Sequence, residues 1–170
     1  PVALDPETDL ALLQYTGGTT GVSKGAILSH GNLLANIAQA LAWLGPAAIE
    51  VRGGAALAAL PFYHVFSLTC NIWTLLGLQI CNVLIPDPRQ LKSIVDAWSA
   101  HPCQVFFGVS TLFNALLRHE AFLRLPFNQL RLVIAGGMAM LPRVAESWQR
   151  ATGVPIIQGY GLTEASPMVS

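Results

Sequence analysis

The chain has 170 residues, which is enough for one domain with a sizeable core. Its nine basic and nine acidic side chains cancel, and this balance argues against a nucleic-acid partner, which a basic surface would attract. Only 11% of the residues are charged and 53% are hydrophobic, a low charge content for an isolated globular domain. The composition therefore indicates either a membrane segment or apolar surface that faces the rest of a larger protein.

The first half of the chain predicts short strands that alternate with helices. Leu33, Ile37, Leu41 and Leu44 recur at helical spacing, and Gly45-Pro46 is expected to end that helix. The predicted strands are 10–15, 26–28, 55–60 and 82–85, and the predicted helices are 32–44 and 66–78.

The second half continues the alternation with clearer helix signals. The segment 89–100 is amphipathic, and Ser110 is expected to cap the helix that follows it. Pro142 suits the first turn of a later helix and Gly153 its C-terminal cap. The predicted strands here are 104–109, 130–135 and 155–158. The alternation predicts one α/β domain over 1–170, with a mainly parallel sheet and helices on both faces.

Two features test the membrane and metal alternatives. The stretch 53–86 lacks acidic and basic residues, but polar residues and Pro61 interrupt it, so a buried strand–helix–strand unit fits better than a membrane span. Cys70, Cys81 and Cys103 form no CxxC pair, which favours reduced thiols in a cytoplasmic protein over a metal cage.

The strongest chemical signal is the segment 15–25, Tyr-Thr-Gly-Gly-Thr-Thr-Gly-Val-Ser-Lys-Gly. Its glycines let backbone N–H groups approach an anion, and its threonine hydroxyls and Lys24 add donors that suit a polyphosphate. The order is not that of a Walker loop, since Ser23 precedes Lys24 and a β-prone run follows. We therefore expect a phosphate-binding loop between two strands, with a plain flexible turn as the alternative.

This segment resembles the phosphate-binding signature of the adenylate-forming superfamily, which includes acyl-CoA synthetases, luciferases and peptide-synthetase adenylation domains. It departs from the usual pattern at Gly17, where Ser or Thr is commoner, and at Ser23, where Pro is commoner. The segment 159–164, Gly-Tyr-Gly-Leu-Thr-Glu, resembles the second nucleotide signature, and Leu162 favours the CoA-ligase and luciferase branches. The Thr-Gly-Gly-Thr-Thr-Gly form is similar to bacterial long-chain fatty acid–CoA ligases.

The resemblance implies a role for each motif residue. Tyr160 would lie against adenine and Thr163 would contact the α-phosphate. Thr16 and Glu164 would contact Mg²⁺, and together with Lys24 they form the implied catalytic set. A carboxylate beside a nucleotide requires an intervening cation, because two bare anions repel. The implied ATP-binding residues are Tyr15, Thr16, Gly17, Gly18, Thr19, Thr20, Gly21, Lys24, Gly136, Gly137, Met138, Gly159, Tyr160, Gly161 and Thr163.

Two weaker matches place the acyl group. Gly137, in Ala-Gly-Gly-Met, matches the position where relatives bring backbone against adenine and acyl group, although a plain helix-entry turn is the alternative. His64 matches a family position near the acyl carboxylate, and a satisfied core histidine is its alternative.

The implied parent enzyme joins a fatty acid to ATP as acyl-AMP and then transfers the acyl group to CoA. The ribose-binding Asp, the hinge and the C-terminal domain with its lysine are expected beyond Ser170, so the fragment is expected to be inactive alone. A cytoplasmic location is expected; peripheral contact with the inner membrane face and a homodimer stay open. The alternatives are a ligase for aryl, short-chain or medium-chain acids, an acyl-AMP ligase, a non-catalytic nucleotide-binding module and a membrane-spanning protein.

Overall fold

The computed structural model describes residues 3–16 and 23–170 and contains two sheets. The smaller sheet pairs β1 (Leu10–Thr16) with β2 (Lys24–Ser29) in antiparallel register. The larger sheet is wholly parallel, in the order β4 (Cys81–Leu84), β3 (Ala55–Ala58), β5 (Val105–Gly108), β6 (Leu132–Ala135) and β7 (Ile156–Gln158).

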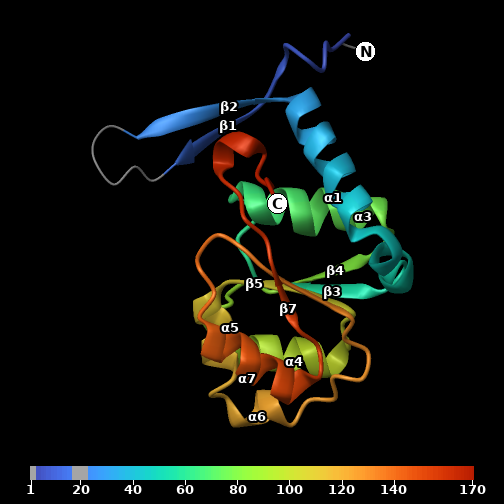
Figure 1. Cartoon of the computed structure of the whole chain (residues 1–170), viewed down its shortest axis with the longest axis vertical. Coiled ribbons are helices and arrows are strands. Elements are labelled where there is room, and N and C mark those ends of the chain that lie inside the picture. Colours follow the sequence, from blue (N-terminus) through green and yellow to red (C-terminus); the bar gives the residue numbers. More distant parts are fainter. Residues whose placement is uncertain (1–2, 17–22) are drawn as a thin grey trace.

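Helices cover both faces of the parallel sheet, which confirms the predicted fold class (Figure 1). One face carries α1 (His30–Val51) and a continuous helical run made of α2 (Val65–Ser67), the π-helical η1 (Leu68–Thr74) and α3 (Leu75–Gly77). The other carries α4 (Leu91–Ala100), α5 (Ser110–Leu116), α6 (Glu120–Leu123) and α7 (Pro142–Thr152). A short 3₁₀ turn, η2 (Thr163–Ala165), follows β7.

Each face of the sheet has its own apolar core. On the α4–α7 side, Trp98 and Trp148 are 1% and 0% exposed and pack against the ring of Phe106 on β5. On the α1 side, Phe107 from the next position of β5 packs with Leu75 and Leu44. Successive residues of β5 thus serve opposite cores, as the two-residue period of a strand requires.

The predicted helix signals are confirmed at Gly45 and wrong at Ser110. Gly45 adopts the non-helical angles φ 47° and ψ −124°, so the helical stretch that begins at His30 ends there as predicted, and a second stretch reaches Val51 across the kink. Val109 is the N-cap of α5, while the Ser110 hydroxyl accepts a hydrogen bond from the Leu141 N–H at 3.4 Å. The predicted roles of Pro142 and Gly153 are confirmed, since Gly153 has φ 79° at the C-cap of α7.

α1 is the one helix among residues 3–16 and 23–170 that is long and apolar enough to cross a membrane by length and composition. This is weak evidence for a span, and the kink at Gly45 divides the helix. The stretch 53–86 forms β3, the helical run of α2, η1 and α3, and β4, which is the strand–helix–strand unit expected from its sequence.

Candidate functional site

A cavity of about 340 Å³ lies at the carboxyl ends of β5, β6 and β7. Ligands of open α/β sheets bind at this edge, because the loops that follow parallel strands all emerge there. The wall includes Gly136 and Gly137 after β6 and the segment 159–164 after β7. It also includes Thr16, the last residue of β1, so the small sheet contributes to the same cavity.

The segment after β7 is folded back on itself. The Tyr160 N–H donates to the Ser170 carbonyl at 2.7 Å, and the Leu162 N–H donates to the Pro167 carbonyl at 2.9 Å. Gly161 is required there, because a Cβ at this position would collide with the Pro167 carbonyl oxygen. The second glycine motif therefore serves to let two backbone stretches approach closely.

Two buried side chains fasten this folded segment to the helices beside it. Asn36 of α1 donates through Nδ2 to the Met168 carbonyl at 2.8 Å, and its Oδ1 accepts from the Met168 N–H at 3.2 Å. Thr69 of η1 donates to the Ser166 carbonyl at 3.1 Å. Both side chains are buried, at 3% and 0% exposure. The loop carrying Glu164 is thus held by specific hydrogen bonds rather than by apolar contact alone.

The cavity brings together most of the predicted site residues that the structure describes. Thr16, at the edge of the glycine loop, and Glu164, at the end of the second motif, both line it. The other predicted residues on its wall are His64, Gly136, Gly137, Gly159, Tyr160, Gly161 and Thr163.

Three predicted residues lie off the cavity wall. Lys24 is exposed at the start of β2, opposite Thr16, whose hydroxyl donates to the Lys24 carbonyl at 3.3 Å. Tyr15 is 65% exposed on β1 and Met138 is 49% exposed after β6. Gly17, Gly18, Thr19, Thr20 and Gly21 lie outside the described residues.

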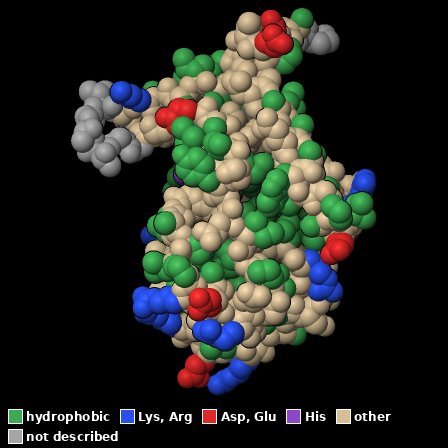
Figure 2. Space-filling model, viewed as in Figure 1, with side chains coloured by type: hydrophobic (Ala, Val, Ile, Leu, Met, Phe, Trp, Pro, Cys, Tyr) green, Lys and Arg blue, Asp and Glu red, His purple; other side chains and the backbone are tan. Residues whose placement is uncertain are grey.

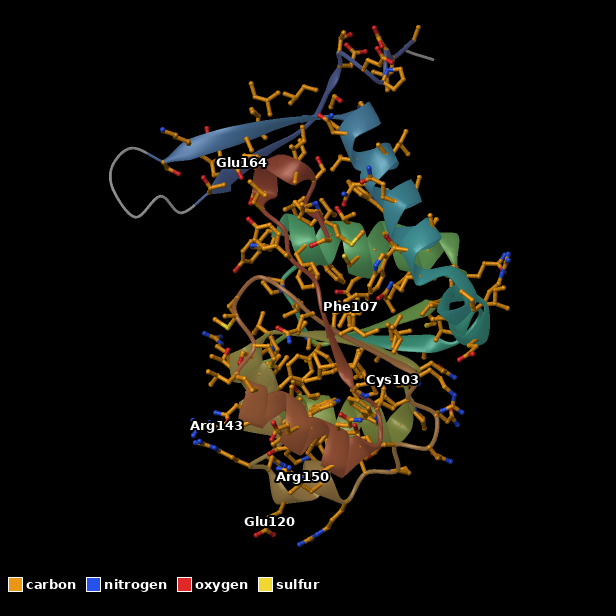
Figure 3. The ribbon with its side chains drawn as sticks, viewed as in Figure 1. Cys103, Phe107, Glu120, Arg143, Arg150 and Glu164 are labelled. Carbon is orange, nitrogen blue, oxygen red and sulfur yellow. The ribbon has the colours of Figure 1, made fainter. Side chains whose placement is uncertain are left out.

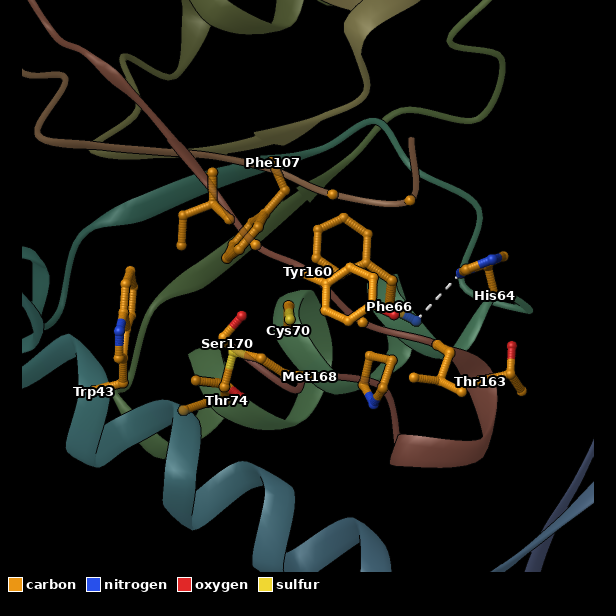
Figure 4. Close-up of a pocket in the computed structure, with 18 of the residues that line it drawn as sticks. Trp43, His64, Phe66, Cys70, Thr74, Phe107, Tyr160, Thr163, Met168 and Ser170 are labelled. Atoms are coloured by element: carbon orange, nitrogen blue, oxygen red, sulfur yellow. Dashed lines mark hydrogen bonds between the residues drawn. The ribbon is translucent and has the colours of Figure 1, made fainter. Parts of the chain in front are cut away.

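His64 combines a structural contact with a place on the wall (Figure 4). Its Nδ1 accepts a hydrogen bond from the Phe66 N–H at 3.3 Å and caps α2. An accepting Nδ1 leaves the proton of the neutral ring on Nε2, the only nitrogen still able to donate to a ligand. The helix-capping contact therefore fixes which nitrogen a carboxylate in the cavity would meet.

Much of the wall is apolar, and sequence analysis did not identify it. Trp43 and Leu44 come from α1, Cys70 from η1, and Phe107 and Ile134 from two strands (Figure 4). These residues are scattered through the chain and carry no motif. Only Phe107 and Ile134 carry a usable signal, which is their position near the carboxyl ends of predicted strands, where α/β ligands bind.

Gly136 shapes this wall through its contact with an aromatic ring. A Cβ built at Gly136 would lie 2.9 Å from Cζ of Phe66, whose ring packs edge-on against Phe107 with centroids 6.1 Å apart. We expect Gly136→Ala to displace the Phe66 ring and to lower the free energy of unfolding by about 1–3 kcal/mol, as overpacking does. Gly159→Ala is the matched control, because the nearest atoms to its Cβ lie at 3.8 and 3.9 Å.

Urea unfolding of both alanine variants measures this difference. Phe66→Leu combined with Gly136→Ala should recover part of the loss, since the smaller side chain leaves room for the new methyl group. Equal stability of the two single variants would show that Phe66 does not limit the size of the side chain at position 136.

The three cysteines differ in their accessibility. Burial raises the pKa of the Cys70 thiol to about 12 and also raises the pKa of the Cys103 thiol, whereas Cys81 is exposed on β4. The thiolate is the reactive form, so we expect a disulfide reagent at pH 8 to modify Cys81 rapidly and the other two only after unfolding. Absorbance of the released thiol checks this, and rapid reaction of all three in the folded chain would contradict it.

The donor set at the cavity suits a hard divalent cation. Thr16 offers a hydroxyl and Glu164 a carboxylate, and the described residues contain no group of three or more His, Cys, Asp or Glu side chains that could hold a metal. Mg²⁺ is commonly bound by one or two carboxylates together with substrate phosphates rather than by a full protein cage. The residues present fit that arrangement.

Comparison with known proteins agrees with this geometry. The AMP-binding enzyme family model matches residues 1–170. The chain is 46% identical over 164 residues to a long-chain-fatty-acid–CoA ligase of Haemophilus influenzae and 47% identical over 163 residues to one of Yersinia pestis. These matches cover 95% and 96% of the chain but 29% of each relative, so the chain spans less than a third of their length.

A solved structure supports the same assignment. ATP-bound MatB from Rhodopseudomonas palustris is 30% identical, with a TM-score of 0.79 over 94% of this chain and 30% of that one. The chain belongs to the AMP-binding enzyme family.

Proposed function

We propose that this chain is the ATP-binding segment of a long-chain fatty acid–CoA ligase. The observation that carries the proposal is that Thr16 and Glu164 line one cavity together with an apolar wall. Long-chain-fatty-acid–CoA ligases are also its relatives at 46% and 47% identity. A cavity with one polar and one apolar part suits a reaction between a triphosphate and a fatty acid.

The reaction has two steps. A carboxylate oxygen of the fatty acid attacks the α-phosphorus of ATP, and pyrophosphate leaves to give acyl-AMP. The thiol sulfur of CoA then attacks the acyl carbon, loses its proton, and displaces AMP. Such chemistry depends on the positioning and charge neutralisation of the phosphates rather than on a covalent protein intermediate.

The polar residues serve the nucleotide. The proposed phosphate contacts are the Thr163 hydroxyl, the Lys24 ammonium and the glycine loop that Thr16 and Lys24 flank. The exposed ring of Tyr160 offers a face for adenine, and Gly136 and Gly137 line the same cavity. Thr16 and Glu164 would hold Mg²⁺, which neutralises phosphate charge when bound.

The apolar part of the cavity serves the acyl group. Trp43, Phe107 and Ile134 supply a wall that excludes water from the alkyl chain. His64 Nε2 and the backbone of Gly137 are proposed to face the acyl carboxylate, where an N–H donor orients the attacking oxygen. We also propose that the enzyme is cytoplasmic. Peripheral contact with the inner membrane face and a homodimeric state are two further points to test.

Pyrophosphate release by the longer protein tests the substrate assignment. With ATP, Mg²⁺ and CoA, palmitate should support faster release than benzoate, acetate or octanoate. Preference for one of these other acids would replace the long-chain assignment by an aryl, short-chain or medium-chain one, and acyl-AMP without acyl-CoA would identify an acyl-AMP ligase.

Lys24→Ala tests the nucleotide site in the same protein. We expect Mg·ATP affinity to fall about tenfold, whereas Lys92→Ala, which removes a lysine paired with Asp96 on α4, should leave it unchanged. Nucleotide binding without any acid-dependent turnover would identify a non-catalytic module instead. The 170-residue chain alone is expected to form no measurable acyl-CoA.

A further inference from the structure

Charge is distributed unevenly along this electrically neutral chain. Between residues 110 and 152, five arginines face two glutamates, which gives a net charge of +3, and the rest of the chain carries four basic and seven acidic residues, or −3. This basic segment includes α5, α6 and α7, at the opposite end of the molecule from Glu164 (Figure 3). Its positive charge is therefore separate from the cavity assigned to the nucleotide.

Three of these arginines border one groove. Arg118 follows α5, while Arg143 and Arg150 lie on α7 at positions i and i+7, with Ser147 between them on the same helix face. The groove has a volume of about 530 Å³ and is open to solvent. Basic side chains are visible on this part of the surface (Figure 2).

The guanidinium groups of the groove are poorly neutralised. No ion pair or side-chain hydrogen bond joins Arg118 or Arg143 to another residue within 3–16 and 23–170. Arg150 donates to the Ser147 hydroxyl at 2.9 Å and lies 4.0 Å from Glu146, the longest ion pair of the described chain. By contrast, Arg124 just outside the groove pairs with Glu120 at 3.0 Å. The unpaired charges inside the groove are a source of binding energy for an anion.

The floor of the groove distinguishes the class of anion. Leu117 and Val144 line it, and Leu123 is 47% exposed at its side. A planar guanidinium group can donate two parallel hydrogen bonds to two oxygens of one phosphate. The apolar floor would contact a carbon group attached to that phosphate. A bare inorganic ion would leave this floor unused.

We propose that the groove of Arg118, Arg143 and Arg150 binds a phosphate ester, either the headgroup of an anionic phospholipid or a soluble phosphorylated metabolite. Both sources present the same chemistry, a phosphate joined to carbon. The site is independent of the nucleotide cavity and does not require the proposed ligase activity.

Binding to vesicles and to a soluble ester separates the two sources. The full chain is mixed at low salt with phosphatidylglycerol vesicles, with phosphatidylcholine vesicles, and with glycerol 3-phosphate. Sedimentation measures vesicle binding, and backbone amide shifts of Ser147 and Ala151, compared with those of Lys24 and Glu164, report which site is occupied. Binding to phosphatidylglycerol alone identifies a lipid headgroup, and amide shifts with glycerol 3-phosphate identify a soluble ester; either result supports the proposal.

The double variant Arg118→Gln/Arg143→Gln should weaken binding at least tenfold. Arg124→Gln is the control for the loss of one positive charge outside the groove, and it should leave affinity close to wild type. Because all three side chains are exposed, the variants should melt at the temperature of the wild-type chain. The proposal is overturned if neither ester binds to the wild-type chain, or if the double variant binds as well as Arg124→Gln.

Discussion

Replacing Glu164 by glutamine is expected to lower Mg·ATP affinity about 100-fold. A loss of about this size is seen when side chains that support a bound metal ion are mutated. The side chain lines the cavity and forms no ion pair within residues 3–16 and 23–170, so its charge is open to a ligand. Glutamine keeps the size of the side chain but removes the charge that Mg²⁺ prefers. The backbone hydrogen bonds of the folded segment should persist, because they do not involve this side chain.

Calorimetric titration of the longer protein with Mg·ATP measures the change. Glu146→Gln provides a control with the same charge difference on an exposed helix far from the cavity. Raising the Mg²⁺ concentration should recover part of the affinity of the Glu164 variant. Unchanged affinity in Glu164→Gln would remove this residue from the metal site.

Replacing Trp148 by alanine is expected to lower the free energy of unfolding by about 3–5 kcal/mol. The side chain is 0% exposed and stacks on Phe106 with ring centroids 6.0 Å apart, while Phe113 meets it edge-on at 4.7 Å. Removing the indole leaves a cavity and loses these ring contacts. Its Nε1 donor has no partner in the described structure, so the loss contains no broken hydrogen bond.

Urea unfolding followed by circular dichroism measures this loss. Trp43→Ala is the control, because that indole is 54% exposed and should cost less than about 1 kcal/mol. Trp148→Phe should retain most of the stability. A loss in Trp148→Ala no greater than in Trp43→Ala would show that the core on the α4–α7 side does not depend on the stacked indole.

The secondary structure could be predicted where the signal was local. Leu91, Ile94, Val95 and Trp98 repeat at helical spacing, and α4 places the last three of them in the core. Pro142 and Gly153 bound α7 because each has a backbone preference that acts without tertiary help. At Gly45 the helical angles break as predicted, but no local signal marked the second stretch of α1, which places Ala48 and Val51 in the core. α6 has only four residues, too few for a periodic pattern to mark it.

The residues of the candidate site likewise fall into those that a local sequence motif marks and those that only the fold brings to the cavity. Thr16 and Glu164 each belong to a short motif, and the resemblance of both motifs to the adenylate-forming signatures predicted that they share one site. Trp43, Phe107 and Ile134 share the cavity only because α1 and two strands are brought together by folding. The capping role of His64 depends on backbone angles at the start of α2, which no residue pattern specifies.

The hydrogen bonds of Asn36 and Thr69 attach the segment after β7 to α1 and η1, two helices that are distant from it in the sequence. α1 starts directly where β2 ends, so the helix that clamps Met168 is also the anchor of the hairpin bearing Thr16. The first turns of α1 therefore connect the hairpin to the segment after β7, so we expect binding at one to affect the other. Hydrogen exchange at the amides of Tyr160 and Leu162 should therefore slow when phosphate binds at the hairpin alone.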